Sequence, residues 1–315
     1  MTEPKGEHAL IDWIRRRTGE AASVPIGPGD DMARVRLGEP DALLTTDTLL
    51  EGTHFRLDEA SPRQVGYKAL AVSLSDCAAM AAEPVAAVAW VALPEDARMT
   101  FAEALFAGLL DAAERFACPI AGGDVTSWTG GLAVGTSVLG QPAGIEPVRR
   151  GGARPGDVLL VTGRLGGAGL GRHLAFVPRV AEARRLARAA NLHAMIDLSD
   201  GLSTDLGHLL RESGVGAEVD APGVPVSPDA ERAAEADGRT PLAHALSDGE
   251  DFELLLAVSA EDAARLARRP PLGNLPLSAV GRIVQGRGAV LLSADGTRAP
   301  LAPAGYEHFR GKGTG

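Results

Sequence analysis

The sequence predicts an α/β protein of about two domains, and three observations support this prediction. Strand-like apolar runs alternate with helix-like patterns, and both halves repeat one order of glycine-flanked acidic motif, strand and helix. The length of 315 residues corresponds to two domains at roughly 150 residues each. A stretch rich in proline and glycine, residues 141–157, interrupts the middle of the chain.

The first half is expected to begin with an amphipathic helix at residues 7–17, which the segment IGPGDD ends. Ser61 is a candidate N-cap, and Pro62 follows it at a position that suits the first turn of a helix. The apolar patterns of this half predict strands at 42–50, 85–93 and 132–140, and helices at 62–82 and 100–117.

The stretch QPAGIEPVRRGGARPGD (141–157) holds three prolines and four glycines without periodicity. We therefore expect an N-terminal domain over residues 1–145 and a C-terminal domain over residues 146–315. In the second half, MIDLSDGLSTDLGHLLRESG starts as a strand and becomes a helix after Asp200. The other expected elements are strands at 157–163, 250–258 and 277–284, and helices near 168–176 and 179–190.

Charge and composition argue against several classes of protein. The formal net charge is −10 and the pI about 5.2, and an acidic surface repels phosphate backbones, so we expect no nucleic-acid partner. Cys77 and Cys118 provide neither a disulfide framework nor a zinc site. No apolar run follows MTEPKGEH, and the longest apolar stretch, near Val85–Leu93, falls short of the about 20 residues of a membrane helix. We expect a cytoplasmic protein without signal peptide or membrane contact.

Six motifs place carboxylates beside glycines or hydroxyls, at expected strand ends or in loops. They are GPGDDMA (27–33), TTDTLLEGTHF (45–55), LSDCAAM (74–80), AGGDVT (121–126), DLSDGLSTD (197–205) and SDGEDFEL (247–254). Magnesium prefers oxygen ligands and commonly takes one or two carboxylates per ion, together with water and phosphate oxygens. Separated aspartates that converge on one cleft would suit two or more such ions holding a triphosphate. Bound cations would also explain how an acidic protein handles phosphates.

Each motif alone has a simpler interpretation. Asp or Ser before a helix is commonly an N-cap, and Asp-Gly is commonly a turn. On this interpretation Asp205 faces solvent on its helix, and Asp31 is a turn residue beside Asp30. The whole set favours metal, because carboxylates about 4 Å apart repel by roughly 1 kcal/mol in water and about 4 kcal/mol at an effective dielectric of 20. Converging carboxylates therefore need a positive charge among them.

Motifs of other enzyme classes are absent from the sequence. It contains no G-x-x-x-x-G-K-[ST], no H-E-x-x-H and no G-x-S-x-G. The glycine run GRLGGAGLGRH (163–173) has the spacing G-x-G-x-G instead of G-x-G-x-x-G, and no acidic residue follows at the distance typical of a dinucleotide site. We interpret it as a tight loop before a helix, with contact to phosphate as the alternative.

Seven motifs resemble, in order, those of the thiamine-monophosphate kinase family. They are GPGDDMA, TTDTLLEGTHF, LSDCAAMAAEP, GGDVT, RGGARPGD, MIDLSDGL and GEDFELL. The similarity covers essentially the whole chain, from about residue 6 to GYEHF at 305–309. The second and sixth motifs are specific, and seven in order are stronger than any one.

This resemblance implies a two-domain fold of the aminoimidazole-ribonucleotide-synthetase type. In that fold the N-terminal α/β domain pairs with its twin, so that strands of two chains form a shared β-barrel in a homodimer. The resemblance also implies ATP as donor, thiamine monophosphate as acceptor and several Mg²⁺ ions. It leaves open the number of ions and a requirement for a monovalent cation.

The resemblance assigns roles to the matching positions of this chain. The implied magnesium ligands are Asp30, Asp47, Asp76, Asp124 and Asp197, with hydroxyl or backbone oxygens from Thr45 and Thr46 and a further cation at Asp200. The implied ATP contacts are Phe106, Gly123, Asp124, Arg150 and Ser199. The implied contacts to thiamine phosphate are His54, Glu250 and Tyr306.

Several of these assignments have alternatives. Phe106 stands where the family commonly has a tyrosine, so a hydroxyl is missing. His54 could be a satisfied polar residue after a strand, and Tyr306 a packing residue. Arg149 is either a solvated neighbour of Arg150 or exchanges roles with it.

The implied chemistry is direct phosphate transfer, without a phospho-enzyme. The acceptor phosphate already carries nucleophilic oxygens, and its second pKa is near 6, so no general base is required. Metal ions and positioning then supply catalysis. The alternatives are another enzyme of the same superfamily with a different acceptor, and a non-catalytic protein that binds nucleotide or thiamine phosphate. The acceptor residues distinguish the first alternative, and turnover of ATP distinguishes the second.

Overall fold

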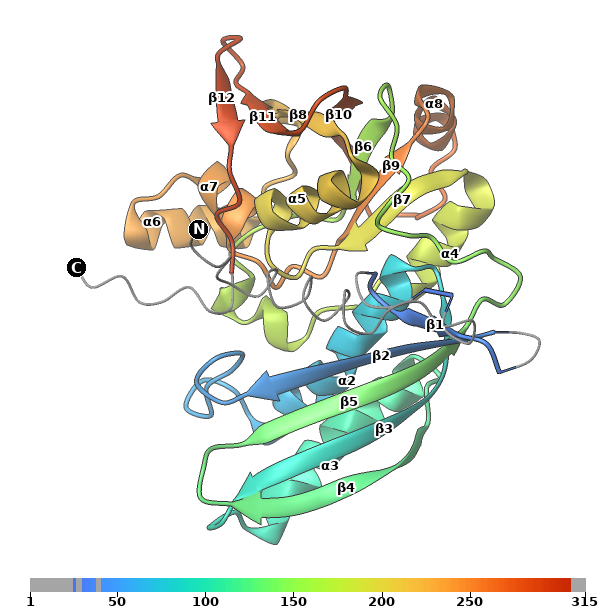
Figure 1. Cartoon of the computed structure of the whole chain (residues 1–315). Helices are drawn as coiled ribbons and strands as arrows, with labels where there is room; N and C mark the ends of the chain where they lie inside the picture. The colour runs from blue at the N-terminus through green and yellow to red at the C-terminus, as the bar shows by residue number, and fades with distance from the viewer. Residues whose placement is uncertain (1–24, 27–29, 38–40, 307–315) are drawn as a thin grey trace, which may run out of the picture.

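The computed structural model describes residues 25–26, 30–37 and 41–306, which form two β-sheets, one in each half of the chain (Figure 1). Residues 142–157 lie between the last strand of the first sheet and the first strand of the second, and they carry no helix or strand. The domain boundary expected at residues 145/146 falls in this segment and stays a prediction. The helix expected at residues 7–17 lies outside the described residues.

The N-terminal sheet has five strands in the order β1-β2-β5-β3-β4. Its strands are β1 (Ala33–Val35), β2 (Ala42–Leu50), β3 (Glu83–Pro94), β4 (Ile120–Trp128) and β5 (Ala133–Gln141). The pairs are antiparallel except β3 with β4, which is parallel. Helices α2 (Pro62–Ala79) and α3 (Met99–Arg115) pack against each other and cover one face of the sheet (Figure 1).

Local chemistry explains where α2 begins and how closely it packs on α3. Ser61 and Gln64 form a capping box that satisfies two backbone N–H groups at the helix start. Gly66 of α2 and Gly108 of α3 face the partner helix, where a Cβ would lie 1.9 Å and 1.8 Å from a backbone oxygen. Glycine is therefore required at both positions, and it lets the two backbones approach closely.

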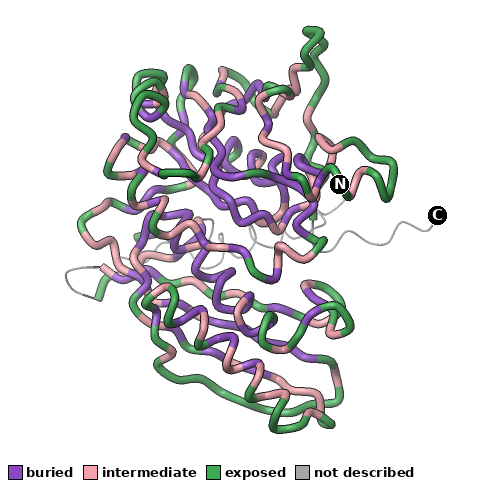
Figure 2. The backbone as a smooth tube through the Cα atoms, turned by 180° about the vertical axis from the view of Figure 1, so that it is seen from behind, coloured by how far each residue is buried: buried purple, intermediate pink, exposed green. Residues whose placement is uncertain are grey.

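The other face and the β4 edge of this sheet are exposed. In β4, every residue from Ala121 to Trp128 is exposed. Exposed apolar side chains on the sheet include Leu44, Val88 and Val125. Figure 2 shows this outer edge in green, in contrast to the buried strands of the other sheet. The sheet is open in the single chain, so the barrel shared by two chains stays a prediction.

The C-terminal sheet has seven strands in the order β12-β11-β8-β10-β6-β9-β7, antiparallel except β8 with β11. Its strands are β6 (Val158–Thr162), β7 (Leu192–Asp197), β8 (Gly216–Asp220), β9 (Leu254–Val258), β10 (Leu277–Val284), β11 (Gly288–Leu292) and β12 (Arg298–Leu301). The helices are α4 (Val180–Ala189), α5 (Leu202–Ser213), α6 (Pro228–Asp237), α7 (Pro241–Ser247) and α8 (Ala260–Arg268). Helix α2 packs against α4 and β7, so it joins the two halves.

Most elements predicted from the sequence are confirmed. The structure confirms strands at 42–50, 85–93, 132–140, 157–163 and 277–284, helices at 62–82, 100–117 and 179–190, and the change from strand to helix around Asp200, within a few residues at each end. Among the described residues, no helix is long and apolar enough to cross a membrane.

Three expectations about local structure are wrong. The helix near 168–176 is a pair of 3₁₀ turns, η1 (Ala168–Leu170) and η2 (Arg172–Leu174), separated by Gly171 at φ 119°. The strand at 250–258 starts only at Leu254, because Glu250 and Phe252 have φ of 55° and 49°, outside the β region. The motif AGGDVT lies inside β4 and the motif LSDCAAM at the end of helix α2, so neither is at a strand end or in a loop.

Candidate active site

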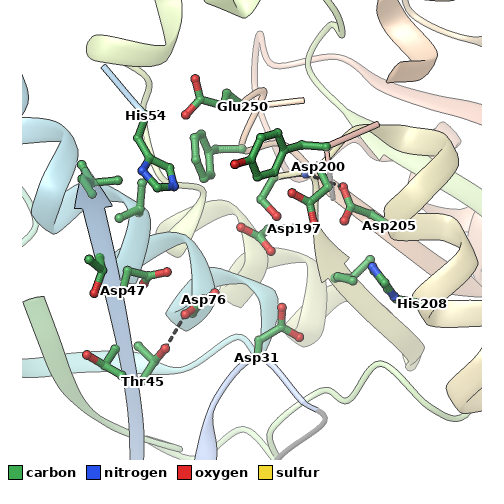
Figure 3. A pocket seen from close by; sticks show the side chains of 18 of the residues that line it. Asp31, Thr45, Asp47, His54, Asp76, Asp197, Asp200, Asp205, His208 and Glu250 are labelled. Carbon is green, nitrogen blue, oxygen red and sulfur yellow. Dashed lines mark hydrogen bonds between the residues drawn. The ribbon is translucent and has the colours of Figure 1, made fainter. Parts of the chain in front are cut away.

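A cavity of about 900 Å³ lies between the two halves of the chain. Strand β2 and helix α2 form one wall, and the segment after β7, the start of α5 and the loop at 248–252 form the other (Figure 3). Twelve predicted site residues line the cavity: Asp30, Thr45, Thr46, Asp47, His54, Asp76, Arg150, Asp197, Ser199, Asp200, Glu250 and Tyr306.

Three carboxylates from distant parts of the sequence meet in this cavity. Asp31 precedes β1, Asp76 lies in the last turn of α2, and Asp197 ends β7. One ligand oxygen of each lies within 4.8 Å of the others. The interpretation of Asp31 as a simple turn residue is therefore wrong, because its buried carboxylate belongs to the cluster.

The cluster is electrostatically unfavourable without a cation. Burial, and then repulsion from neighbouring aspartates, raises the pKa of Asp76 well above its ordinary value. Burial, followed by repulsion from Asp31, raises the pKa of Asp197 to about 7. Buried carboxylates at this spacing form a set of hard oxygen donors, which fits a divalent cation such as magnesium.

Strand β2 adds two more oxygen-bearing side chains on the face that α2 covers. Asp47 accepts a hydrogen bond of 2.8 Å from the Ser73 hydroxyl, and burial raises its pKa. Thr45 donates to the Asp76 carboxylate. Side chains alternate along a strand, so Thr46 lies on the opposite face, where its hydroxyl donates to the Thr136 carbonyl at 3.1 Å. Thr46 as a metal ligand stays a prediction.

Two arginines provide part of the missing positive charge. Arg150 donates two hydrogen bonds to the Asp31 carboxylate, of 2.8 Å from Nε and 2.9 Å from Nη2. Asp30 accepts from the Arg150 backbone N–H at 2.9 Å and from Arg149 Nε at 3.2 Å. Arg149 is more than half exposed, whereas Arg150 lines the cavity. Of the two, only Arg150 lines the cavity, and its contact with ATP stays a prediction.

A second group of possible metal ligands consists of Asp200, Asp205 and His208, whose ligand atoms lie within 4.8 Å of one another. The expectation that Asp205 faces solvent is wrong, since only 2% of it is exposed. Its carboxylate accepts the Asp200 backbone N–H at 3.0 Å, and burial and repulsion from Asp200 raise its pKa well above the ordinary value. The spacing of three residues on α5 puts Asp205 and His208 on one face, which is a signal the sequence offered.

The predicted acceptor residues gather at another end of the cavity, where Figure 3 shows His54 near Glu250. The Leu50 backbone N–H donates to His54 Nδ1 at 3.0 Å, so Nδ1 accepts and Nε2 holds the ring proton. Glu250 is fixed by its backbone N–H, which donates to the Ser199 carbonyl at 2.7 Å. Tyr306 also lines the cavity, and its backbone N–H donates to the Asp200 carbonyl at 3.3 Å.

Three predicted residues do not line the cavity of their own chain: Phe106, Gly123 and Asp124. Phe106 lies on α3 and packs against the N-terminal core. Gly123 and Asp124 lie on β4, which forms the edge of the sheet farthest from β1 and β2. Their contacts with ATP or metal stay predictions.

The glycine-rich loop at 163–173 uses its amides within the protein. The Gly166 N–H donates to both oxygens of Asp251, at 2.9 and 3.0 Å, and the Gly167 N–H donates to Asp248 at 2.9 Å. The interpretation as a tight loop fits these bonds, and these two amides have carboxylate partners in place of a phosphate.

Comparison with known proteins identifies both halves. The family described as AIR synthase related protein, N-terminal domain, matches residues 29–141, and the corresponding C-terminal domain family matches residues 154–293. A thiamine-monophosphate kinase of Rhodopirellula baltica is 39% identical over 96% of this chain and 97% of its own length. The thiamine-monophosphate kinase of Escherichia coli K12 is 34% identical over 96% and 98%.

Solved structures agree with these matches. The structure of AaThiL complexed with AMPPCP and TMP superposes with a TM-score of 0.82 at 31% identity, over 96% of this chain and 97% of that one. The hydrogenase maturation protein HypE in complex with ATP superposes with a TM-score of 0.70 at 21% identity, which shows the shared fold alone. The chain therefore belongs to the AIR synthase related proteins and, within them, to the thiamine-monophosphate kinase family.

Proposed function

We propose that this protein transfers the γ-phosphate of ATP directly to thiamine monophosphate, giving thiamine diphosphate and ADP, in a magnesium-dependent reaction. The observation that supports this most strongly is the single cavity in which buried carboxylates from both halves converge beside His54 and Glu250. A related structure holds AMPPCP and TMP together, so the fold accommodates a donor and an acceptor at once.

The carboxylates divide into two proposed cation sites. Asp31, Asp47, Asp76 and Asp197 would hold the ions next to the triphosphate, and Asp200 would hold a further cation with support from Asp205. Bound divalent ions would neutralise the charge of two polyanions and stabilise charge in the transition state.

The protein's own groups orient the reactants. Arg150 would exchange its bonds to Asp31 for phosphate oxygens of ATP, a contact that suits its fork-shaped guanidinium. Ser199 lines the cavity beside Asp200 and would contact the nucleotide. His54 would present Nε2–H to the acceptor, and the Tyr306 ring would stack on a thiamine ring. No side chain acts as a nucleophile, because the acceptor phosphate oxygen attacks directly.

We further propose that the protein works as a homodimer whose interface includes the exposed N-terminal sheet. Strand β1 pairs only with residues 42–44 of β2, so the described residues leave the rest of that edge without a strand partner. The edge strand β4 is exposed from Ala121 to Trp128. A second copy that pairs these edges would cover the open sheet and bring Gly123 and Asp124 of one subunit to the cavity of the other.

The direct experiment is end-point product analysis with purified protein, ATP, thiamine monophosphate and magnesium, with and without EDTA. The proposal expects thiamine diphosphate only when magnesium is available. ATP binding without thiamine diphosphate would overturn the acceptor assignment, and thiamine diphosphate formed equally in EDTA would overturn the metal requirement.

A further inference from the structure

Lys68 is the single lysine among the residues that the structure describes. The whole chain has three lysines, Lys5, Lys68 and Lys312, against 28 arginines. The ion pairs at Asp31, Asp251 and Glu253 all use arginine. A chain that uses arginine almost throughout thus carries a lysine at one buried position, and the chemistry of an ammonium group explains it.

The Lys68 side chain is completely buried in α2, and its contacts point to the acceptor end of the cavity. Its Nζ donates to a carboxylate oxygen of Glu250 at 2.5 Å and to the backbone carbonyl of His54 at 2.7 Å. A buried ammonium must be paired, and both of its partners belong to residues that line the cavity. Lys68 itself does not line it, so the ammonium lies behind the site.

The two contacts join the two halves of the chain at the place where the acceptor is expected. His54 belongs to the loop after β2, and Glu250 to the loop before β9. Glu250 adopts φ 55°, which is unfavourable for a residue with a side chain and persists only when its surroundings hold it. The Glu250 backbone bond to Ser199 and the side-chain bond to Lys68 together provide that restraint.

An ammonium suits this position better than a guanidinium. It is a compact charge with three donors on a flexible stem, whereas the guanidinium is a wide planar fork. With none of the side chain exposed, there is no room for the fork to turn away. The ammonium also places a full positive charge directly against the Glu250 carboxylate, whose side chain is about one third exposed.

We propose that Lys68 is a positioning residue of the acceptor site, which holds the Glu250 carboxylate oriented so that its other oxygen faces the cationic thiazolium ring of the acceptor. The inference rests on the proposed function, since it assumes thiamine monophosphate as the acceptor. Lys68 would thus act on acceptor binding through Glu250, with little effect on ATP.

The test is steady-state kinetics of the Lys68→Met protein with both substrates varied. Loss of a hydrogen bond to a charged group corresponds to roughly 10- to 100-fold, so we expect the KM for thiamine monophosphate to rise by that factor while the KM for ATP changes less than about twofold. The matched control is Arg63→Met. Arg63 lies on the same helix as Lys68 but is exposed and pairs with Asp111 of α3, so its removal should leave both KM values unchanged.

A double-substitution cycle with Glu250→Gln separates positioning from a structural role. If Lys68 acts through Glu250, adding Lys68→Met to the Glu250→Gln protein should raise the acceptor KM less than about twofold. If the two substitutions instead raise the acceptor KM by the product of their separate effects, or if both KM values rise in parallel, the inference is overturned.

Should Lys68→Met not fold, the comparison is between Glu250→Met and the Lys68→Met/Glu250→Met pair, because apolar replacement of a whole buried ion pair is often tolerated. Equal acceptor KM values would support the inference, and unequal values would overturn it.

Failure of the proposed function and failure of the Lys68 inference give different results. If the wild-type protein makes no thiamine diphosphate, the proposed function itself fails before any variant is compared. If the wild-type protein is active and Lys68→Met has wild-type KM values, only the role of Lys68 is excluded.

Discussion

The two ends of the cavity treat buried carboxylates in opposite ways. At the metal end, Asp31, Asp76 and Asp197 crowd together with Arg150 as a nearby cation, and the pKa values of Asp76 and Asp197 are raised. At the acceptor end, Glu250 has a buried lysine bonded to it. At the Glu250 end the protein supplies the positive charge itself, through Lys68, whereas at the Asp31 end we propose that bound cations supply most of it. At the proposed metal end the described protein groups balance the carboxylate charge only in part, whereas at the proposed acceptor end Lys68 already pairs with Glu250.

The largest expected effect comes from removing a carboxylate at the metal end. Asp76→Asn keeps the shape of the side chain but takes one charge from the cluster, so we expect kcat to fall on the order of 1,000-fold, the size of several kcal/mol of lost charge stabilisation. Initial rates of thiamine diphosphate formation across a magnesium titration measure it. The control is Asp111→Asn, an exposed aspartate on α3. Near-normal kcat in Asp76→Asn would refute the assignment of Asp76 as a metal ligand.

Complementation between two inactive variants sharpens the description of the metal end. If Asp124 serves the cavity of the partner subunit, dimers of Asp47→Asn or of Asp124→Asn alone lack every intact site. When equal amounts of the two chains mix at random, about half of the dimers contain one chain of each kind. One of the two sites in each mixed dimer is intact, so about a quarter of wild-type activity should return. The measurement is the specific activity of the purified mixture. No recovery would show that Asp124 does not act across the interface.

At the acceptor end, a smaller effect is expected from His54. His54→Phe removes the Nε2–H donor that faces the acceptor, so the KM for thiamine monophosphate should rise about tenfold, as for one lost hydrogen bond to a charged group. The kcat should change less, because the phosphate needs no general base. Loss of chemistry with both substrates still bound, measured by single-turnover rates, would show that His54 has a chemical role.

A separate effect, on stability instead of turnover, is a pH dependence that belongs to the proposed metal end. The folded-state pKa of Asp197 is raised to about 7, while an aspartate in an unfolded chain titrates near about 3.9. Between these values the folded protein keeps a proton that the unfolded chain releases, so the stability of the metal-free protein should fall as pH rises from about 4 to about 7. Asp197→Asn should reduce this slope.

Urea unfolding in EDTA at a series of pH values measures the slope, and equal slopes for both proteins would exclude Asp197 as its source. Adding magnesium should stabilise the wild-type protein more at pH 7.5 than at pH 5, because carboxylate ligands must be deprotonated to bind metal. Equal stabilisation at both pH values would argue against a carboxylate site.

Local patterns in the sequence were sufficient for most of the fold. The Ser61–Pro62 start predicted α2, and the β-rich run at 42–50 predicted β2 with its bounds. The patterns failed where backbone conformation depends on tertiary contacts. Glu250 lies in the left-handed region because backbone and side-chain bonds to distant residues hold it there. The turns at 168–174 form because glycines interrupt what periodicity alone interpreted as a helix.

The candidate site was predicted in part. Twelve of the assigned residues line one cavity, since strand β2, helix α2 and the segment after β7 all border it. Asp205 and Asp31 fit N-cap and turn patterns that are common on surfaces, and the sequence does not show that both are buried. Lys68 stood inside an ordinary helical pattern, and its partners are 14 and 182 residues away.

The sequence by itself determined the types of the elements and the motifs that mark the family, because periodicity, capping and motif order are local properties of the chain. The tertiary structure alone decided which carboxylates meet. Asp47 and Asp124 both belong to acidic motifs, yet strand order and side-chain alternation put Asp47 in the cavity and Asp124 on the far edge of the same sheet. Burial and charge pairing then follow from that arrangement, since both depend on neighbours that the chain brings together only by folding.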